Sequence, residues 1–231
     1  MAAGSSSHKN RPPDGRFPGR GRVSSWNEFR AHNHERRALF AAHRAEDQDG
    51  LVFVGDSITE GWHSLLAQDF GDLGVKLVNR GIGGDTTPNL LYRLNDDVLS
   101  LHPRALVILI GTNDLGEHTP PADIAANLRT LHARIRAAYP KIPIAWCLVM
   151  PRGDGPQYPA EIRDLNERIR RLAASDPLIT VCDTYTPLAT PQGTDIPADF
   201  HPDNLHPNDA GYAVWSSVLH PILAGWHLAG R

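Results

Sequence analysis

Five short apolar runs, separated by segments with helical periodicity, constrain the fold of this chain more than any other feature of its sequence. Each run is continuously apolar rather than alternating, which is typical of strands buried on both faces of a sheet. The runs are residues 51–54, 75–78, 105–110, 142–150 and 178–181, and the helical segments are 86–100, 122–138, 160–174 and 208–223. This alternation predicts βαβ units with right-handed crossovers. The expected fold is α/β, a three-layer α/β/α sandwich around a flavodoxin-like, five-stranded parallel sheet.

The residues before the first apolar run divide into a tail and a helix. Residues 1–22 carry five basic side chains against one acid and are rich in Gly and Pro, so we expect a disordered basic tail there. Residues 24–47 mix apolar residues with many charges, which predicts an exposed amphipathic helix outside the sheet, capped by Ser24 or Ser25. A chain of 231 residues can bury one substantial core, so residues 23–231 are expected to form a single domain.

Charge, cysteine content and hydropathy exclude several classes of protein. The net charge is −3 and basic residues gather in the tail, so the folded part offers no basic face to nucleic acid. Cys147 and Cys182 stand inside apolar runs, where a cysteine is typically a small buried side chain rather than half of a disulfide. No apolar stretch approaches the ~18 residues of a membrane span, and the first residues are not those of a signal peptide. We expect a cytoplasmic protein, although a signal peptide removed beforehand would leave no trace.

Functional residues are expected at the carboxyl ends of the strands, where ligands bind in a parallel α/β sheet. The first run leads into Gly55, Asp56 and Ser57, at the start of a helix. A serine in this position is a candidate nucleophile, because its own N–H and the helix dipole can stabilise an oxyanion. Taken alone, Ser57 is equally well explained as a helix cap.

The next two runs also end in polar or glycine-rich turns. The turn after the second run contains Gly84, a candidate main-chain N–H donor. A nucleotide site is a weaker interpretation, because the turn lacks the lysine of a P-loop. Asn113 follows the third run, and its side-chain amide can donate a hydrogen bond to an oxyanion without titrating. The alternative for Asn113 is an ordinary loop-forming turn.

The last segment of interest contains Asp203 and His206, just before the final helix. The histidine could take a proton from Ser57 while the carboxylate orients its ring, in the chain order Ser, Asp, His. Asp199 and His201 are alternatives of the same kind. A metal role for this segment lacks a second cluster of ligands, so we expect no metal and no cofactor.

In this order, the four segments resemble the blocks of the SGNH or GDSL-like hydrolase family. The blocks correspond to Gly55-Asp56-Ser57, Gly84, Asn113, and Asp203 with His206. The resemblance implies a catalytic triad of Ser57, Asp203 and His206 and an oxyanion hole formed by Ser57, Gly84 and Asn113. Within the family, the chain is most similar to the catalytic subunits of brain-type platelet-activating-factor acetylhydrolases. The resemblance to the family also implies the SGNH hydrolase fold, which agrees with the fold predicted above.

The resemblance further implies a serine esterase that hydrolyses short-acyl, acetyl-type esters of small molecules through an acyl-serine intermediate. Ile58, Thr112 and Leu205 flank the catalytic positions and would then wall a tight acyl pocket. Relatives form homodimers, for which Trp26 and Phe29 are candidate contacts.

Two alternative functions and one further residue stay open at this point. A carbohydrate acetyl esterase would need an open site, which residues 184–206 could build. A non-catalytic module could bind an acetylated ligand in the same fold. Arg152, after the fourth run, could meet an anionic leaving group or be an ordinary surface arginine.

Overall fold

The computed structural model describes residues 16–62 and 65–229, and residues 1–15 of the predicted basic tail lie outside this part. The strands are β1 (Leu51–Gly55), β2 (Leu77–Gly81), β3 (Ala105–Leu109), β4 (Ile144–Cys147) and β5 (Ile179–Cys182). The helices are α1 (Phe29–Ala42), α2 (Ser57–Gly61), α3 (Leu66–Phe70), α4 (Thr87–Asp97), α5 (Thr112–Gly116), α6 (Pro121–Ala138), α7 (Tyr158–Ala174) and α8 (Asp209–Ala224), with short 3-10 turns η2 (Gly71–Leu73), η3 (Leu99–Leu101) and η4 (Thr186–Leu188).

The five strands form one parallel sheet in the order β2-β1-β3-β4-β5. This is the flavodoxin-like order, so the predicted fold class is confirmed. The chain reverses its direction of strand addition between β1 and β3. The segments after these two strands therefore diverge and leave a crevice at their carboxyl ends, where α2 and α5 begin.

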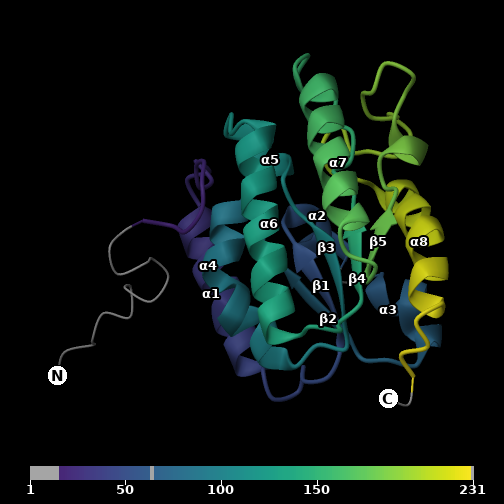
Figure 1. The fold of residues 1–231 in the computed structure, drawn as a ribbon. Helices are drawn as coiled ribbons and strands as arrows, with labels where there is room; N and C mark the ends of the chain where they lie inside the picture. The colour runs from purple at the N-terminus through teal and green to yellow at the C-terminus, as the bar shows by residue number, and fades with distance from the viewer. Residues whose placement is uncertain (1–15, 63–64, 230–231) are drawn as a thin grey trace.

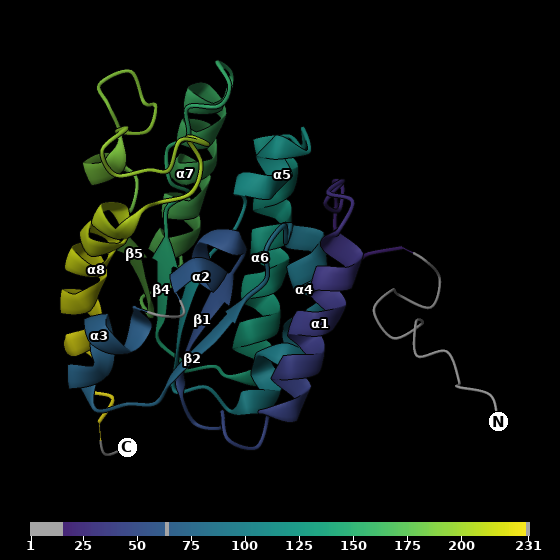
Figure 2. The ribbon, with the colours of Figure 1, turned by 180° about the vertical axis from the view of Figure 1, so that it is seen from behind.

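Helices cover both faces of the sheet (Figures 1 and 2), and an apolar core lies on each face. Side chains alternate along each strand, so Val52 and Val54 of β1 pack with α4, α6 and α7. Leu51 and Phe53 pack on the other face with α3 and α8. α1 lies outside this sandwich and contacts α4.

The bounds of several elements differ from the predicted ones, α1, β2 and β4 among them. α1 begins at Phe29 rather than at residue 24, and its N-cap residue makes no side-chain cap. β2 extends to Gly81 because Arg80, although charged, is 3% exposed and donates to Asp47 and to the carbonyl of Asp97. β4 ends at Cys147, three residues before the end of the apolar run.

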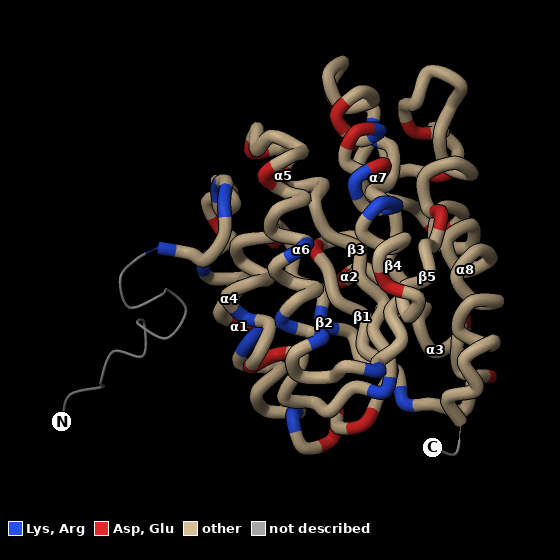
Figure 3. Tube along the Cα trace, viewed as in Figure 1, with Lys and Arg blue, Asp and Glu red and all other residues tan. Residues whose placement is uncertain are grey.

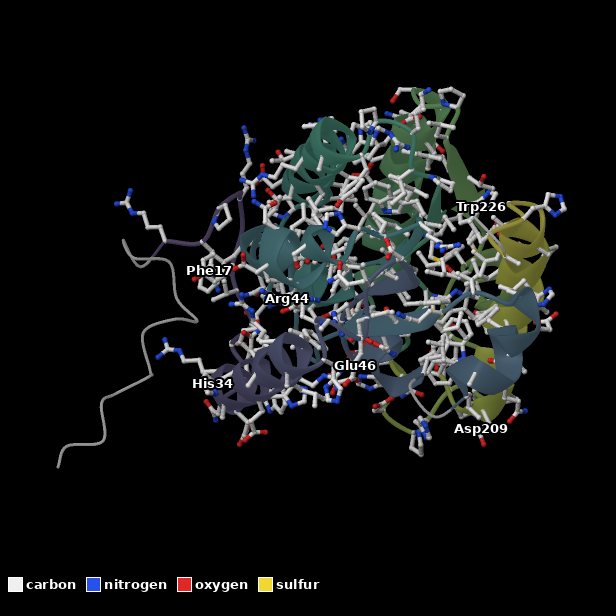
Figure 4. The ribbon with its side chains drawn as sticks, turned by 90° about the horizontal axis from the view of Figure 1, so that it is seen from below. Phe17, His34, Arg44, Glu46, Asp209 and Trp226 are labelled. Atoms are coloured by element: carbon white, nitrogen blue, oxygen red, sulfur yellow. The ribbon has the colours of Figure 1, made fainter. Side chains whose placement is uncertain are left out.

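Residues 16–26, which we call the N-terminal strap, lie against the helical layer. Residues 16–22 were expected to be disordered, but they make specific contacts. The ring of Phe17 meets the ring of Tyr92, in α4, edge to face, with the ring centroids 5.4 Å apart. Figure 4 labels Phe17 beside the helical layer. The main chain of Arg20 donates to the side chain of Asn127 and accepts from it, at 2.8 Å each. Figure 2 shows the strap above α1 and beside α5.

The distribution of charge, the hydropathy of the helices and the state of the cysteines indicate no additional function. Lysine and arginine are interspersed with acidic residues along the tube in Figure 3. No helix among the described residues is long and apolar enough to cross a membrane. Cys147 and Cys182 are buried, free and paired in register across β4 and β5. A cytoplasmic location and a homodimer remain predictions.

Candidate active site

Ser57, Asp203 and His206 lie in one hydrogen-bonded row at the crevice. Ser57 is the first residue of α2, whereas Asp203 and His206 belong to the loop before α8. The Nε2 atom of His206 lies 2.8 Å from Ser57 Oγ, and its Nδ1 atom lies 2.6 Å from Asp203 Oδ2. Of the two acid–histidine pairs in this loop, the structure therefore brings Asp203 and His206, rather than Asp199 and His201, to the serine.

The carboxylate of Asp203 is fixed by its own loop. Its Oδ1 atom accepts hydrogen bonds from the main-chain N–H groups of Leu205 and His206, both at 3.0 Å. Burial raises the pKa of Asp203, but these bonds and the His206 ring outweigh burial and lower the pKa to about 2. An ionised carboxylate favours a proton on Nδ1, which leaves Nε2 able to accept a proton from Ser57.

Ser57 is free for this contact because its neighbour caps the helix. Asp56 is the N-cap of α2, and its Oδ1 atom accepts from the N–H of Ile58 at 3.0 Å. The alternative interpretation of Ser57 as the cap is therefore wrong. The hydroxyl of Tyr212, in α8, donates to the carbonyl of Ile58 at 2.8 Å and ties α2 to the rest of the fold.

Gly84 and Asn113 line the same pocket as Ser57. Gly84 has a φ of +78°, and a Cβ there would lie 2.9 Å from Phe29, so this close approach requires glycine. One N–H of the Asn113 side chain donates to the carbonyl of Asp85 at 3.0 Å. Since an amide has two such hydrogens, the other remains for the pocket. These groups, with the N–H of Ser57, could stabilise an oxyanion.

The pocket has a volume of about 790 Å³, much more than an acetyl group occupies. It is lined by residues from the strap, α1, α2, α5 and the loops after β2, β4 and η4. They are Ser24, Ser25, Trp26, His32, Arg36, Ser57, Glu60, Gly61, Gly83, Gly84, Asn113, Gly116, Glu117, Arg152, Leu205 and His206.

Two nitrogen-bearing side chains in the pocket wall are held by a carboxylate of α2. Glu60 Oε2 lies 2.8 Å from His32 Nε2, and Glu60 Oε1 lies 3.2 Å from Arg36 Nε. The same carboxylate accepts the N–H of Gly83 at 2.6 Å, which holds the loop that carries Gly84. Glu60 thus balances charge in the wall and positions that loop.

Arg152 also lines the pocket, and it is not an ordinary surface arginine. It is 5% exposed, and its guanidinium forms a bidentate pair with Asp154, at 2.6 and 2.5 Å. The Nη1 atom donates to the carbonyl of Thr112 at 2.9 Å. Its charge is therefore already neutralised, which weakens its expected role as a receptor for an anionic leaving group.

The structure separates the three residues predicted to bind the acyl group. Leu205 lines the pocket, as expected. Ile58 is 2% exposed and belongs to the core between the sheet and α8, and Thr112 is 3% exposed beneath Arg152. Neither Ile58 nor Thr112 lines the pocket, because the side chain of each points into the packed interior at the start of its short helix.

Sequence reasoning missed most of the pocket wall. Trp26 and Phe29 were considered only as dimer contacts, but Trp26 lines the pocket and Phe29, 6% exposed, packs beside Gly84. Of residues 184–206, only Leu205 and His206 line it. A helix at residues 24–47 was the expected local pattern, so nothing in the sequence pointed these residues toward Ser57.

Within residues 16–62 and 65–229, no three His, Cys, Asp or Glu side chains gather in a group able to hold a metal ion.

Comparison with known proteins places the same elements in a described family. A model of the GDSL-like lipase/acylhydrolase family matches residues 53–214. The platelet-activating factor acetylhydrolase IB subunit alpha1 of Homo sapiens is 28% identical over 188 residues, covering 80% of this chain and 79% of that protein.

Solved structures agree with this match. A GDSL-like lipase from Bacteroides thetaiotaomicron has a TM-score of 0.70 and 26% identity, covering 82% of this chain and 97% of that one. The lipase/acylhydrolase from Enterococcus faecalis has a TM-score of 0.66 and 25% identity, covering 78% and 97%.

Proposed function

Because the chain belongs to the GDSL-like lipase/acylhydrolase family, we propose that it is a serine esterase that hydrolyses short-acyl carboxylic esters, acetyl esters above all. The observation that carries the proposal is the row from Ser57 through His206 to Asp203, at 2.8 and 2.6 Å, at the edge of a pocket. The acetyl preference is supported by the matched acetylhydrolase subunits, whose names state that acyl group.

The proposed reaction has two steps. His206 takes the proton of Ser57 as the hydroxyl attacks the ester carbonyl, and the N–H groups of Ser57 and Gly84 with the amide of Asn113 stabilise the oxyanion. His206 then protonates the departing alcohol, leaving an acyl-serine. Water, deprotonated by His206, attacks the acyl-serine and releases the acid. Asp203 orients the ring and stabilises its protonated form.

The test is covalent labelling by a fluorophosphonate probe combined with turnover of nitrophenyl esters of increasing acyl length. The wild-type protein should be labelled at Ser57 and should hydrolyse the acetate fastest. Ser57→Ala should keep the fold and lose labelling and turnover by roughly 10⁶-fold in kcat.

The matched control is Ser217→Ala, which removes an exposed serine from α8 and should leave labelling and turnover unchanged. Wild-type turnover by Ser57→Ala would refute the assignment of the nucleophile. Ligand binding without labelling or turnover would instead support the non-catalytic module.

A further inference from the structure

One arginine is completely buried beneath the loop that carries Gly84. Arg93 belongs to α4, whose apolar side chains pack on the sheet, and the residue is 0% exposed. A charged side chain is almost never found in such a place unless it is paired and hydrogen-bonded. Arg93 takes no part in the two chemical steps proposed above. The partners of its guanidinium therefore indicate what the buried charge contributes.

The guanidinium of Arg93 joins the ends of two neighbouring strands. Its Nη2 atom donates to the main-chain carbonyl of Gly55 at 3.1 Å and to that of Arg80 at 2.8 Å. Gly55 ends β1 two residues before Ser57, and Arg80 directly precedes the last residue of β2. These bonds lie at the carboxyl ends of the strands, where the loops of the site begin. Arg93 is thus fixed relative to the segment that presents the proposed nucleophile.

The same guanidinium holds the carboxylate of Asp85. The Nε atom of Arg93 donates to Asp85 Oδ2 at 2.6 Å, and the two side chains are 1% and 0% exposed. Burial raises the pKa of Asp85 to about 6, and the charge and hydrogen bond of Arg93 are the largest influences that oppose this rise. Above this pH the two side chains form a buried ion pair, in which each charge compensates the other.

Asp85 in turn contacts Asn113 through its main chain. Asp85 directly follows Gly84, and its carbonyl accepts the hydrogen bond from the Asn113 side chain at 3.0 Å. This bond fixes the direction of the amide and leaves its second hydrogen for the pocket. A displacement of Asp85 would therefore move the Asn113 amide. The buried arginine is in this way linked to a proposed oxyanion donor that it does not touch.

Arg136 makes bonds of the same kind elsewhere in the fold. Its Nε atom lies 2.5 Å from Asp176 Oδ2, and its Nη1 atom donates to the carbonyl of Ile142 at 2.6 Å. Its side chain is 16% exposed, and none of these three residues lines the pocket. A comparison of Arg136 with Arg93 therefore separates a contribution to stability from a contribution to the site.

We propose that Arg93 is a positioning residue for the reaction, which acts through Asp85 to hold the amide of Asn113 where the oxyanion forms. The inference rests on the proposed esterase function. A preorganised donor stabilises developing charge because it is already in place when the charge appears. Loss of Arg93 should therefore weaken binding of the transition state and leave binding of the ester nearly unchanged.

The first test is Arg93→Met, which keeps a long side chain and removes its donors. We expect kcat for nitrophenyl acetate to fall roughly 10²-fold, the loss that a displacement of about 1 Å can cause, whereas KM should change less than about twofold. Inhibition by a trifluoromethyl ketone, which forms a tetrahedral adduct with a serine, should weaken in proportion to kcat/KM. Arg136→Met is the matched control, and it should lower stability in urea but leave kcat and inhibition unchanged.

A double-mutant cycle tests the route through Asn113. Asn113→Ala alone should lower kcat by roughly 10²- to 10³-fold, because it removes one donor. Since Arg93 acts on that donor, Arg93→Met should cost less than about tenfold when it is added to Asn113→Ala. A loss that stays near about 10²-fold in the Asn113→Ala protein would overturn the proposal.

A further variant keeps the test valid where Arg93→Met alone disturbs the fold. Arg93→Met combined with Asp85→Asn removes both buried charges, a change that is often neutral for stability. The low kcat should persist in this protein at a urea midpoint close to that of the wild type, because no guanidinium holds residue 85.

The outcomes separate the two proposals. Wild-type kcat in Arg93→Met, or recovery of wild-type kcat when Asp85→Asn is added, would show that Arg93 only compensates charge and would overturn the positioning role. Absence of nitrophenyl acetate turnover together with absence of Ser57 labelling in the wild-type protein would instead overturn the esterase function.

Discussion

At the scale of single residues, His206, the proposed base, and its partner Asp203 share one short loop. Asp203 uses both carboxylate oxygens on that loop, Oδ1 for the N–H groups of Leu205 and His206 and Oδ2 for the His206 ring. The two functional side chains are therefore positioned together, and a change in the acid acts on the base directly.

Asp203→Asn tests this link. The new amide keeps an oxygen for the two N–H groups but places a donor where His206 Nδ1 needs an acceptor, which favours the wrong tautomer. We expect kcat to fall on the order of 10⁴-fold, less than for Ser57→Ala. Steady-state kinetics on nitrophenyl acetate measure the loss.

Asp199→Asn is the matched control from the same loop and should retain wild-type kcat. An equal loss in both variants would mean that the loop, rather than the carboxylate of Asp203, had been disturbed.

The positions of the proposed catalytic residues beside one another were predictable, because these residues belong to local motifs near strand ends. Ser57, Gly84 and Asn113 each lie within four residues of the end of a strand, and the sheet brings such positions together. The pocket wall was not predictable in this way. Trp26 and Glu117 lie far apart in the sequence, and no local pattern indicates that they meet.

At the scale of elements, the segment after β4 is held by a helix instead of by a strand. Asn166 of α7 accepts the N–H of Val149 at 2.7 Å and donates to its carbonyl at 2.9 Å. The side chain of Asn166 is buried and occupies both hydrogen-bonding groups that a neighbouring strand would use. This explains why β4 is shorter than its apolar run.

Asn166→Ala should therefore destabilise the protein. It leaves the N–H and the carbonyl of Val149 buried without partners, at a cost of about 1–3 kcal/mol each. We expect the free energy of unfolding, measured in urea, to drop by about 2–4 kcal/mol. The control is Thr130→Ala, an exposed change on α6, which should alter the free energy of unfolding little. Asn208→Ala would be unsuitable as a control, because Asn208 caps α8.

A drop below about 0.5 kcal/mol in Asn166→Ala would show that Val149 finds other partners.

The location of the elements themselves was largely predictable, because buried parallel strands and amphipathic helices leave distinct patterns. The exceptions are places where a polar side chain is buried, as at Arg80 in β2, since hydropathy assigns such residues to the surface.

At the scale of the whole molecule, buried carboxyl groups lie beneath the site. Asp56 and Asp114 are completely buried, and burial raises the pKa of each to about 7. Asp114 accepts bonds from the N–H and the hydroxyl of Thr87, and Asp56 accepts from Ile58. The fold therefore binds protons that an unfolded chain would release.

Stability should depend on pH accordingly. Between about pH 4 and about pH 7 the folded protein binds more protons than the unfolded chain, so the free energy of unfolding falls as pH rises. The contribution of Asp203 has the opposite sign, because its pKa is lowered to about 2, and it is lost as pH falls through about 2. Urea unfolding at about pH 5 and about pH 8 should show the first effect.

Asp56→Asn should make this dependence shallower, because the variant has no proton to lose at that position. Glu35→Gln, an exposed change on α1, should leave it as in the wild type. A wild-type slope in Asp56→Asn would mean that its carboxyl group is already ionised in the folded protein across this range.

The strap has a last consequence, for the order in which the molecule assembles. None of residues 16–26 belongs to either apolar core, and the strap's hydrogen bonds to Glu117 and Asn127 join residues 92 and 107 positions apart. Such contacts form late, since the chain loses entropy before they stabilise it. The strap can dock only on finished helices, so the part of the pocket wall that Ser24, Ser25 and Trp26 supply should form after the rest of the pocket.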